Sequence, residues 1–195
     1  MRSLSLMTLL AFSVSLFFGC GSNPLISLDR GDYLPMFVGA KWFYTGAPPD
    51  STFRDTTTVV GTATRGGNKY FILQHTNNPI PAGDQRQFLR AFGNKIYINY
   101  EGRDFLYIDF NQPEGKSWES YADFKGMILR KDFEITTPAG HFSHAVEVAF
   151  ESRTLRDAPG PHLTFVPRVG IVQYGGYSVR PAKLAGYNID YASEN

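Results

Sequence analysis

Alternating apolar and polar residues recur along most of the chain, and this pattern limits the possible folds more than any other feature. In one typical segment, Leu106, Ile108 and Phe110 share one face of an extended backbone. A period of two residues is typical of strands with one buried and one solvent-exposed face. The sequence therefore predicts an all-β domain over residues 32–195.

Turn-forming Gly, Asn, Pro and Asp residues separate the expected strands. These strands are residues 41–45, 53–64, 69–75, 85–92, 95–100, 105–110, 127–136, 142–150, 170–174 and 184–191. Most connections are short, so consecutive strands should pair antiparallel. Because a sheet of about ten strands rarely stays flat, we expect a single, strongly curled antiparallel sheet, either barrel-like or folded over as a sandwich.

Helices and long loops are few in this pattern. Residues 118–125 and 154–158 are the two short segments that we expect to be helical outside the N-terminal leader. Residues 76–84 and 151–162 form two longer polar loops. Such loops on a rigid sheet often carry binding sites, although most of them are only connectors.

The chain begins with the layout of a secretory signal peptide. Arg2 supplies a positive charge, residues 4–18 are apolar or small and uncharged, and the single cysteine, Cys20, follows shortly after them. We therefore expect residues 1–19 to be a cleaved signal peptide. Residues 20–31 would then form a lipidated cysteine and a short tether before the folded domain.

The sequence around Cys20 resembles the lipobox of bacterial lipoproteins. Gly19 occupies the small position before the cysteine, whereas Phe17 and Phe18 are bulkier than the usual residues. The resemblance implies that Cys20 carries a diacylglyceryl group and a further acyl chain such as palmitate, and two or more chains anchor a protein stably. Gly21 rather than Asp follows the cysteine, which by resemblance to enteric lipoproteins favours the outer membrane, facing the periplasm.

Three other interpretations of the leader compete with this one. A plain buried cysteine is the least suited of them, because the junction at Cys20 is polar and rich in glycine. Gly19 and Gly21 are both small, so cleavage after Gly21 would release an ordinary secreted protein. A membrane-spanning helix would need about 20 apolar residues, and the uncharged run over residues 4–18 is shorter than that.

Charge and cysteine content exclude several functional classes. The 195-residue chain has 19 Lys and Arg and 18 Asp and Glu, and removing the leader takes away Arg2, which leaves 18 of each. A protein without net positive charge is not typical of nucleic-acid binding. After Cys20 there is no cysteine, so disulfides and thiolate zinc sites within the folded domain are excluded.

Three stretches resemble a group of small bacterial lipoproteins of unknown function. Residues 33–44 are similar to their Y-x-P-L-x-x-G-x-x-W-x-Y opening, residues 137–142 to a T-P-A-G-x-F turn, and residues 165–172 to an A-P-G-V-G-L-V stretch. Arg168 stands where that last stretch has glycine, so a left-handed backbone there would be costly. The resemblance implies an exported β-rich domain and supplies no catalytic residues.

The same stretches have a structural interpretation. Gly39 is expected to permit a turn, and Trp42 is expected to anchor the core. The Gly-x-x-Trp spacing returns at Gly115 and Trp118, which raises the hypothesis of an internal duplication.

No sequence motif assigns a catalytic, metal or cofactor site. His141 and His144 have a spacing that suits a metal on a helix, but in the expected strand they would point to opposite faces. The phosphate-binding glycine motifs and the G-x-S-x-G elbow are absent, while a Ser-His-Asp triad needs no fixed spacing and stays open. We therefore expect no cofactor, no metal and no enzymatic activity.

The sequence supports two main hypotheses for function. The first is a noncatalytic, membrane-anchored envelope lipoprotein that binds another envelope protein or has a structural role. The alternative is a carrier that holds a lipid or another apolar ligand inside the curled sheet, which would require an internal cavity of about 300 Å³ or more. A hydrolase is a third hypothesis, and it would need a nucleophile hydrogen-bonded to a histidine in a cleft.

Overall fold

The computed structural model describes residues 33–47, 51–77, 86–154, 159–176 and 179–189. Twelve strands form in this part of the chain: β1 (Lys41–Gly46), β2 (Arg54–Arg65), β3 (Asn68–His75), β4 (Arg86–Phe92), β5 (Lys95–Tyr100), β6 (Arg103–Asp109), β7 (Ser117–Glu119), β8 (Phe124–Thr137), β9 (Gly140–Ser152), β10 (Pro159–Val166), β11 (Gly170–Gly176) and β12 (Val179–Asn188). In the described part no helix is long and apolar enough to cross a membrane.

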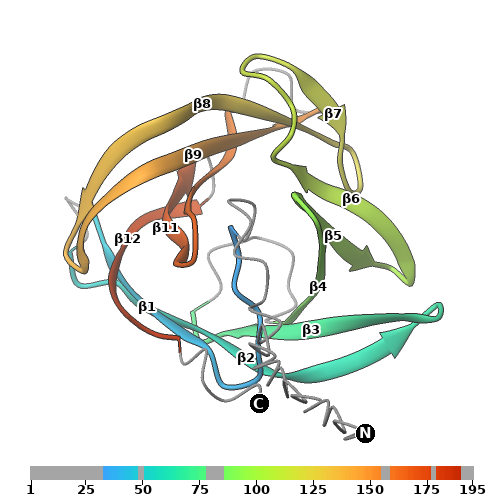
Figure 1. The fold of residues 1–195 in the computed structure, drawn as a ribbon, viewed down its shortest axis with the longest axis horizontal. Helices are drawn as coiled ribbons and strands as arrows, with labels where there is room; N and C mark the ends of the chain where they lie inside the picture. The colour runs from blue at the N-terminus through green and yellow to red at the C-terminus, as the bar shows by residue number, and fades with distance from the viewer. Residues whose placement is uncertain (1–32, 48–50, 78–85, 155–158, 177–178, 190–195) are drawn as a thin grey trace, which may run out of the picture.

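All twelve strands belong to one antiparallel sheet that curls almost completely around (Figure 1). Their order is β6-β5-β4-β3-β2-β1-β12-β11-β10-β9-β8-β7, so each strand pairs with its neighbours in sequence except at one place. The first and last strands pair with each other, from Lys41 opposite Asn188 to Gly46 opposite Ala182. The prediction of an all-β, single curled sheet is confirmed, and of its two forms the barrel is the one that occurs.

The barrel has a seam between β6 and β7, whose facing edges do not pair as strands. Side chains bridge this seam instead. Trp118 Nε1 and Ser120 Oγ both donate to the backbone oxygen of Tyr107, over 3.1 and 3.0 Å. These bonds occupy a carbonyl that an unpaired strand edge would otherwise leave free for another chain.

Side chains fill the inside of the barrel. In β1 the exposed and buried positions alternate, so Trp42 and Tyr44 point inward, and Trp42 is only 1% exposed. The N-terminal segment, residues 33–40, lies within the outline of the barrel (Figure 1). Its Leu34 and Phe37 are buried in the core. The core is therefore the barrel interior itself, plugged by the chain that leads into β1.

The two Gly-x-x-Trp sequences occupy equivalent positions in the sheet. Gly39 has φ +99° and its N–H donates to a carbonyl of β2 over 2.8 Å, while Gly115 has φ +73° and donates to a carbonyl of β8 over 2.9 Å. Trp42 and Trp118, three residues later, both turn into the core. The two halves of the sheet, β1–β6 and β7–β12, thus each begin with a glycine turn followed by a buried tryptophan, as an internal duplication would produce.

Two sequence-based predictions at the strand level are wrong. Residues 118–125 are not a helix, because β7 and the start of β8 pair here and Trp118 packs against Gly126 across the pair. Strand β10 begins inside what we expected to be the loop over residues 151–162. A register shift between Pro159 and His162 lets the strand include two prolines, which lack the N–H that a regular ladder requires.

Several turn predictions are confirmed. Gly66 and Gly67 form the β2–β3 turn with φ of +55° and +80°, and Gly140 follows the β8–β9 turn with φ +145°. Arg168 adopts φ +64° in the β10–β11 turn, a left-handed conformation that is more costly for arginine than for glycine. The expected helix over residues 154–158 lies almost entirely outside the described residues, as do residues 78–85.

Candidate functional site

A buried carboxylate lies inside the barrel close to the start of β2. Asp55 lies in β2 between the exposed Arg54 and the half-buried Thr56, so it points inward, and it is 2% exposed. Its Oδ1 accepts hydrogen bonds from Thr76 Oγ1 (3.1 Å) and from the backbone N–H of Asn77 (2.9 Å). Its Oδ2 accepts one from the hydroxyl of Tyr174 on β11 (3.2 Å). Three donors from two separate parts of the chain therefore satisfy this carboxylate.

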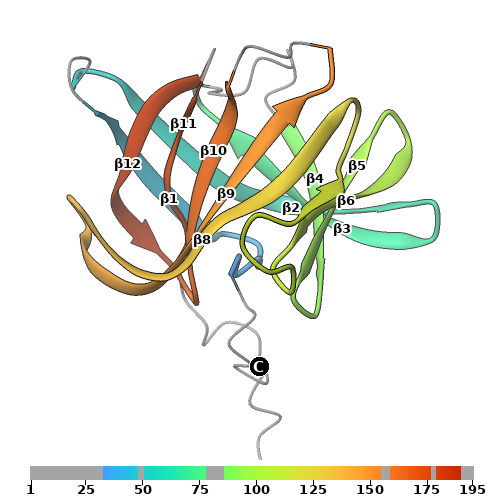
Figure 2. The ribbon, with the colours of Figure 1, turned by 90° about the horizontal axis from the view of Figure 1, so that it is seen from above.

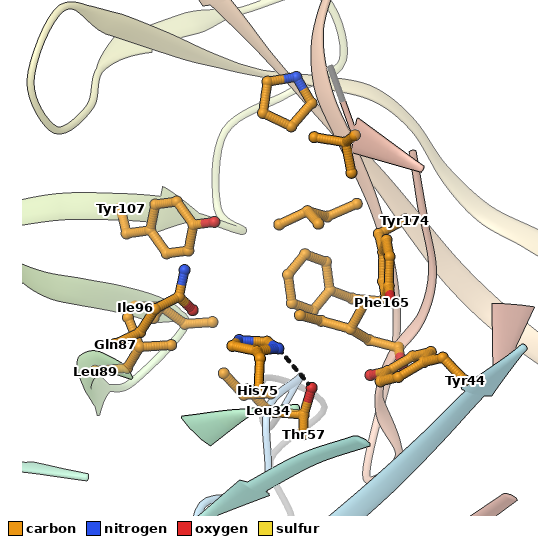
Figure 3. Close-up of a pocket in the computed structure, with 14 residues that line it drawn as sticks. Leu34, Tyr44, Thr57, His75, Gln87, Leu89, Ile96, Tyr107, Phe165 and Tyr174 are labelled. Carbon is orange, nitrogen blue, oxygen red and sulfur yellow. Dashed lines mark hydrogen bonds between the residues drawn. The ribbon is translucent and has the colours of Figure 1, made fainter. Parts of the chain in front are cut away.

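His75, the last residue of β3, lies beside Asp55. It faces Thr57 in the β2–β3 register, and its Nδ1 is 2.9 Å from Thr57 Oγ1 and 3.5 Å from Asp55 Oδ2 (Figure 3). The other ring nitrogen, Nε2, is buried and has no hydrogen-bond partner. Asp55, Thr57, His75 and Tyr174 are called the polar cluster below.

The cluster shifts the acidity of its own members. Burial raises the pKa of Asp55, but the nearby His75 ring, the Asn77 N–H and the Thr76 hydroxyl lower it more, so its pKa lies below the ordinary value. Burial, followed by the charge of Asp55, raises the pKa of Tyr174 far above its usual range. Tyr44, which lies edge-to-face against Tyr174 with ring centroids 4.9 Å apart, has its pKa raised for the same reasons. At neutral pH Asp55 is therefore ionised and both tyrosines are protonated.

A cavity of about 30 Å³ adjoins the cluster. Its walls come from both sides of the barrel and from the N-terminal plug; they are Leu34, Tyr44, Thr57, His75, Gln87, Leu89, Ile96, Tyr107, Pro161, Leu163, Phe165, Ile171, Tyr174 and Val179. Figure 3 shows His75 and Gln87 on one side of this space and Phe165 and Tyr174 on the other. A space of this size holds about one or two water molecules, far less than the cavity that a lipid carrier requires.

The geometry of the cluster does not match a nucleophile–histidine–acid triad. In such triads the nucleophile and the acid contact opposite nitrogens of the imidazole. Here Thr57 and Asp55 both face Nδ1, and Nε2 faces neither. The cluster can therefore hold β2, β3 and β11 together, but it does not form a proton relay from a hydroxyl through the ring to the carboxylate.

The sequence-based candidates lie elsewhere. Cys20, the expected lipid attachment site, lies outside the described residues. His141 bonds Thr136 Oγ1 through Nδ1 over 3.0 Å, and His144 bonds Asp132 through Nδ1. His144 also has φ +56°, so the regular alternation that we expected between the two histidines is interrupted. Among the described residues no group of three His, Cys, Asp or Glu could hold a metal ion.

The polar cluster was not predicted from the sequence. The sequence did contain an indication of it, because Asp55 occupies the same inward face of β2 as Thr57 and Val59, where an apolar residue is the rule. An acidic residue at an inward strand position implies a buried network of donors. The partners Thr76 and Tyr174 cannot be read from the pattern, since they approach from distant parts of the chain.

No protein-family model matches the sequence. No curated protein matches it either. A solved structure described as a "putative exported protein with YmcC-like fold", from Bacteroides fragilis NCTC 9343, aligns over 81% of this chain and 99% of its own, with 12% identity and a TM-score of 0.50. A "putative lipoprotein" from Parabacteroides distasonis ATCC 8503 aligns over 82% of this chain and 100% of its own, with 16% identity and a TM-score of 0.44. The similarity to the Bacteroides fragilis protein shows the fold, so this chain has a YmcC-like fold.

Proposed function

We propose that this protein is a noncatalytic, lipid-anchored protein of the bacterial cell envelope, held at the outer membrane through Cys20 and facing the periplasm. Its barrel would act through its outer surface and its loops, by binding another envelope protein or by a structural role. The anchor is supported by the leader that ends at the chain's single cysteine and by the resemblance of residues 33–44 to the opening of small bacterial lipoproteins.

The filled barrel is the observation that carries the noncatalytic part of this proposal. In the described part of the chain, core side chains and the N-terminal plug occupy the interior, and the cavity beside the polar cluster measures only about 30 Å³. The most enzyme-like group in the described part, the polar cluster, lacks the arrangement of a triad, and its free Nε2 is buried. The cavity that described residues line beside the polar cluster is far smaller than the one a carrier needs.

Metabolic labelling with palmitate tests the anchor. Wild-type protein should incorporate the label and fractionate with the outer membrane, whereas Cys20→Ala should incorporate none because the chain has no other cysteine. Ser22→Ala is the matched control and should keep the label. Equal labelling of wild type and Cys20→Ala, or no label in either, would contradict the anchor.

Native mass spectrometry of the lipidated protein tests the mode of action. A co-purified protein partner at fixed stoichiometry supports a binding role. A non-covalently bound lipid that remains inside the protein after detergent exchange would instead support the carrier.

A further inference from the structure

The antiparallel order of the strands defines two different rims of the barrel. Because successive strands alternate in direction, residues 33–40 lie at the same end as the turns after β2, β4, β6, β8 and β10. We call this end the N-terminal rim, and the end where β1, β3, β5, β7, β9 and β11 finish the opposite rim. Figure 2 shows the blue N-terminal segment at the same end as the green β4–β5 turn.

Phe92 is the most exposed large hydrophobic side chain in the described part, at 73%. It is the last residue of β4 and therefore lies on the N-terminal rim. The turn that follows contacts the place where the chain reaches the barrel: Tyr33 stacks on Phe110 with ring centroids 4.2 Å apart, and the Phe110 N–H donates to the backbone oxygen of Asn94 over 2.9 Å. Phe92 thus lies two residues before Asn94, which is linked through Phe110 to Tyr33, the first described residue.

Other exposed apolar side chains share this half of the barrel. Val38, in the N-terminal segment, is 56% exposed. Phe43, Val60 and Tyr187 each lie in the half of their strand that is nearer the N-terminal rim. Of the exposed large hydrophobics in the described ranges, Leu129 in the middle of β8 is the exception. Single exposed apolar residues are ordinary on a protein surface, but here most of them lie toward one end of the barrel, where a contact with an apolar surface would bury them.

We propose that the N-terminal rim rests on the lipid bilayer, with the Phe92 ring inserted at the boundary between headgroups and acyl chains. The proposal rests on the proposed anchor at Cys20. Twelve residues separate Cys20 from Tyr33, and fully extended they reach at most about 45 Å. The rim at which this tether ends is therefore the part of the barrel held closest to the membrane, and tethering raises its effective concentration there.

This orientation points the opposite rim into the periplasm. Strands β3 and β9 end there, and β4 and β10 begin there. The polar cluster also lies toward the opposite rim, since Asp55 is near the start of β2 and His75 ends β3. The membrane would then hold the barrel with the polar cluster directed away from the bilayer.

Quenching by brominated lipid tests the orientation in the full lipidated protein. Phe92→Trp places a reporter on the N-terminal rim, and Lys125→Trp places one at an exposed position of β8 near the opposite rim. Each protein is reconstituted into vesicles of phosphatidylethanolamine and phosphatidylglycerol, with or without brominated phosphatidylcholine. The two native tryptophans, Trp42 and Trp118, are buried, so the wild-type signal can be subtracted.

The added emission of Phe92→Trp should fall by about half in brominated vesicles, because a ring at this depth of about 5–10 Å lies within reach of the chains. The added emission of Lys125→Trp should not change. If both variants float with the vesicles and Trp emission at position 92 is not quenched more than at position 125, the docking is wrong while the anchor stands. If neither protein floats with the vesicles, the anchor itself is wrong and the docking fails with it.

Discussion

The hydroxyl of Tyr174 donates a hydrogen bond to the carboxylate of Asp55, joining β11 to β2 across a separation of 119 residues in sequence. The two strands are not adjacent in the sheet, because β1 and β12 lie between them. The bond therefore crosses the barrel interior and links its first and last thirds. The other carboxylate oxygen of Asp55 accepts hydrogen bonds from Thr76 and Asn77.

Removing this donor should weaken the folded state. Tyr174→Phe deletes a hydrogen bond to a buried carboxylate, and bonds to charged groups contribute about 1.5–3 kcal/mol. We expect the free energy of unfolding to fall by about 2 kcal/mol in urea titrations. Tyr187→Phe is the matched control, because Tyr187 is 43% exposed, and it should leave the unfolding midpoint unchanged. An unchanged midpoint in Tyr174→Phe would show that the bond contributes nothing.

Acidification should destabilise the protein through Asp55. The folded-state pKa of Asp55 is lowered, whereas in the unfolded chain it lies near about 3.9. A lowered folded pKa stabilises the protein above the unfolded value, and this contribution disappears as the pH falls through the folded pKa.

The test compares wild type with Asp55→Asn across a pH series. At pH 7 the variant should be less stable by about 2 kcal/mol, since a buried carboxylate network is disrupted. Between about pH 5 and pH 2 the difference should shrink. Asp109 and Asp123 also have lowered pKa values and contribute to the acid sensitivity of both proteins, so the difference between the two isolates Asp55. A stability difference between the two proteins that stays constant with pH would contradict the lowered pKa of Asp55.

The barrel seam should open when its side-chain bridge is removed. Trp118→Phe combined with Ser120→Ala deletes both hydrogen bonds to the Tyr107 carbonyl, each of which contributes about 1 kcal/mol. Hydrogen exchange should accelerate in β6 and β7, while β1 and β12, which pair through a full ladder, should keep their protection. If hydrogen exchange accelerates equally in all strands, the substitutions destabilise the whole barrel and do not open the seam locally.

Close packing at Trp118 should make Gly126 intolerant of a side chain. A Cβ at this position would come within 2.3 Å of the indole ring, and overpacking of a filled core costs about 1–3 kcal/mol. Gly126→Ala should lower the melting temperature measured by circular dichroism. Gly61→Ala is the control within a strand, because a Cβ there meets nothing within 4 Å, and its melting temperature should match wild type or exceed it. Equal effects of both substitutions would refute the packing argument.

Period-two alternation in the sequence was sufficient to predict most of the sheet. Strands such as β1 and β5 combine inward aromatic or aliphatic residues with turn residues at their ends, and local pattern alone identifies them. It failed at β10, where Pro159 and Pro161 indicated a loop and a register shift accommodates them. It also failed at β7, a three-residue strand too short to show a period.

Closure of the sheet and the polar cluster depend on contacts between distant residues. Nothing local in β1 and β12 specifies that Lys41 lies opposite Asn188, so barrel and sandwich were equally compatible with the pattern. Asp55 could be recognised as an unusual inward residue, but the approach of Tyr174 depends on how the whole sheet curls. Both features depend on contacts between residues far apart in the sequence, and local strand propensity does not determine them.

The intact mass of the mature protein purified from a bacterial envelope tests the anchor most directly. We expect a chain that begins at Cys20 and is heavier than residues 20–195 by a diacylglyceryl group and, where N-acylated, by one further acyl chain. A chain that begins beyond Cys20, or one that begins there without added lipid mass, would contradict it.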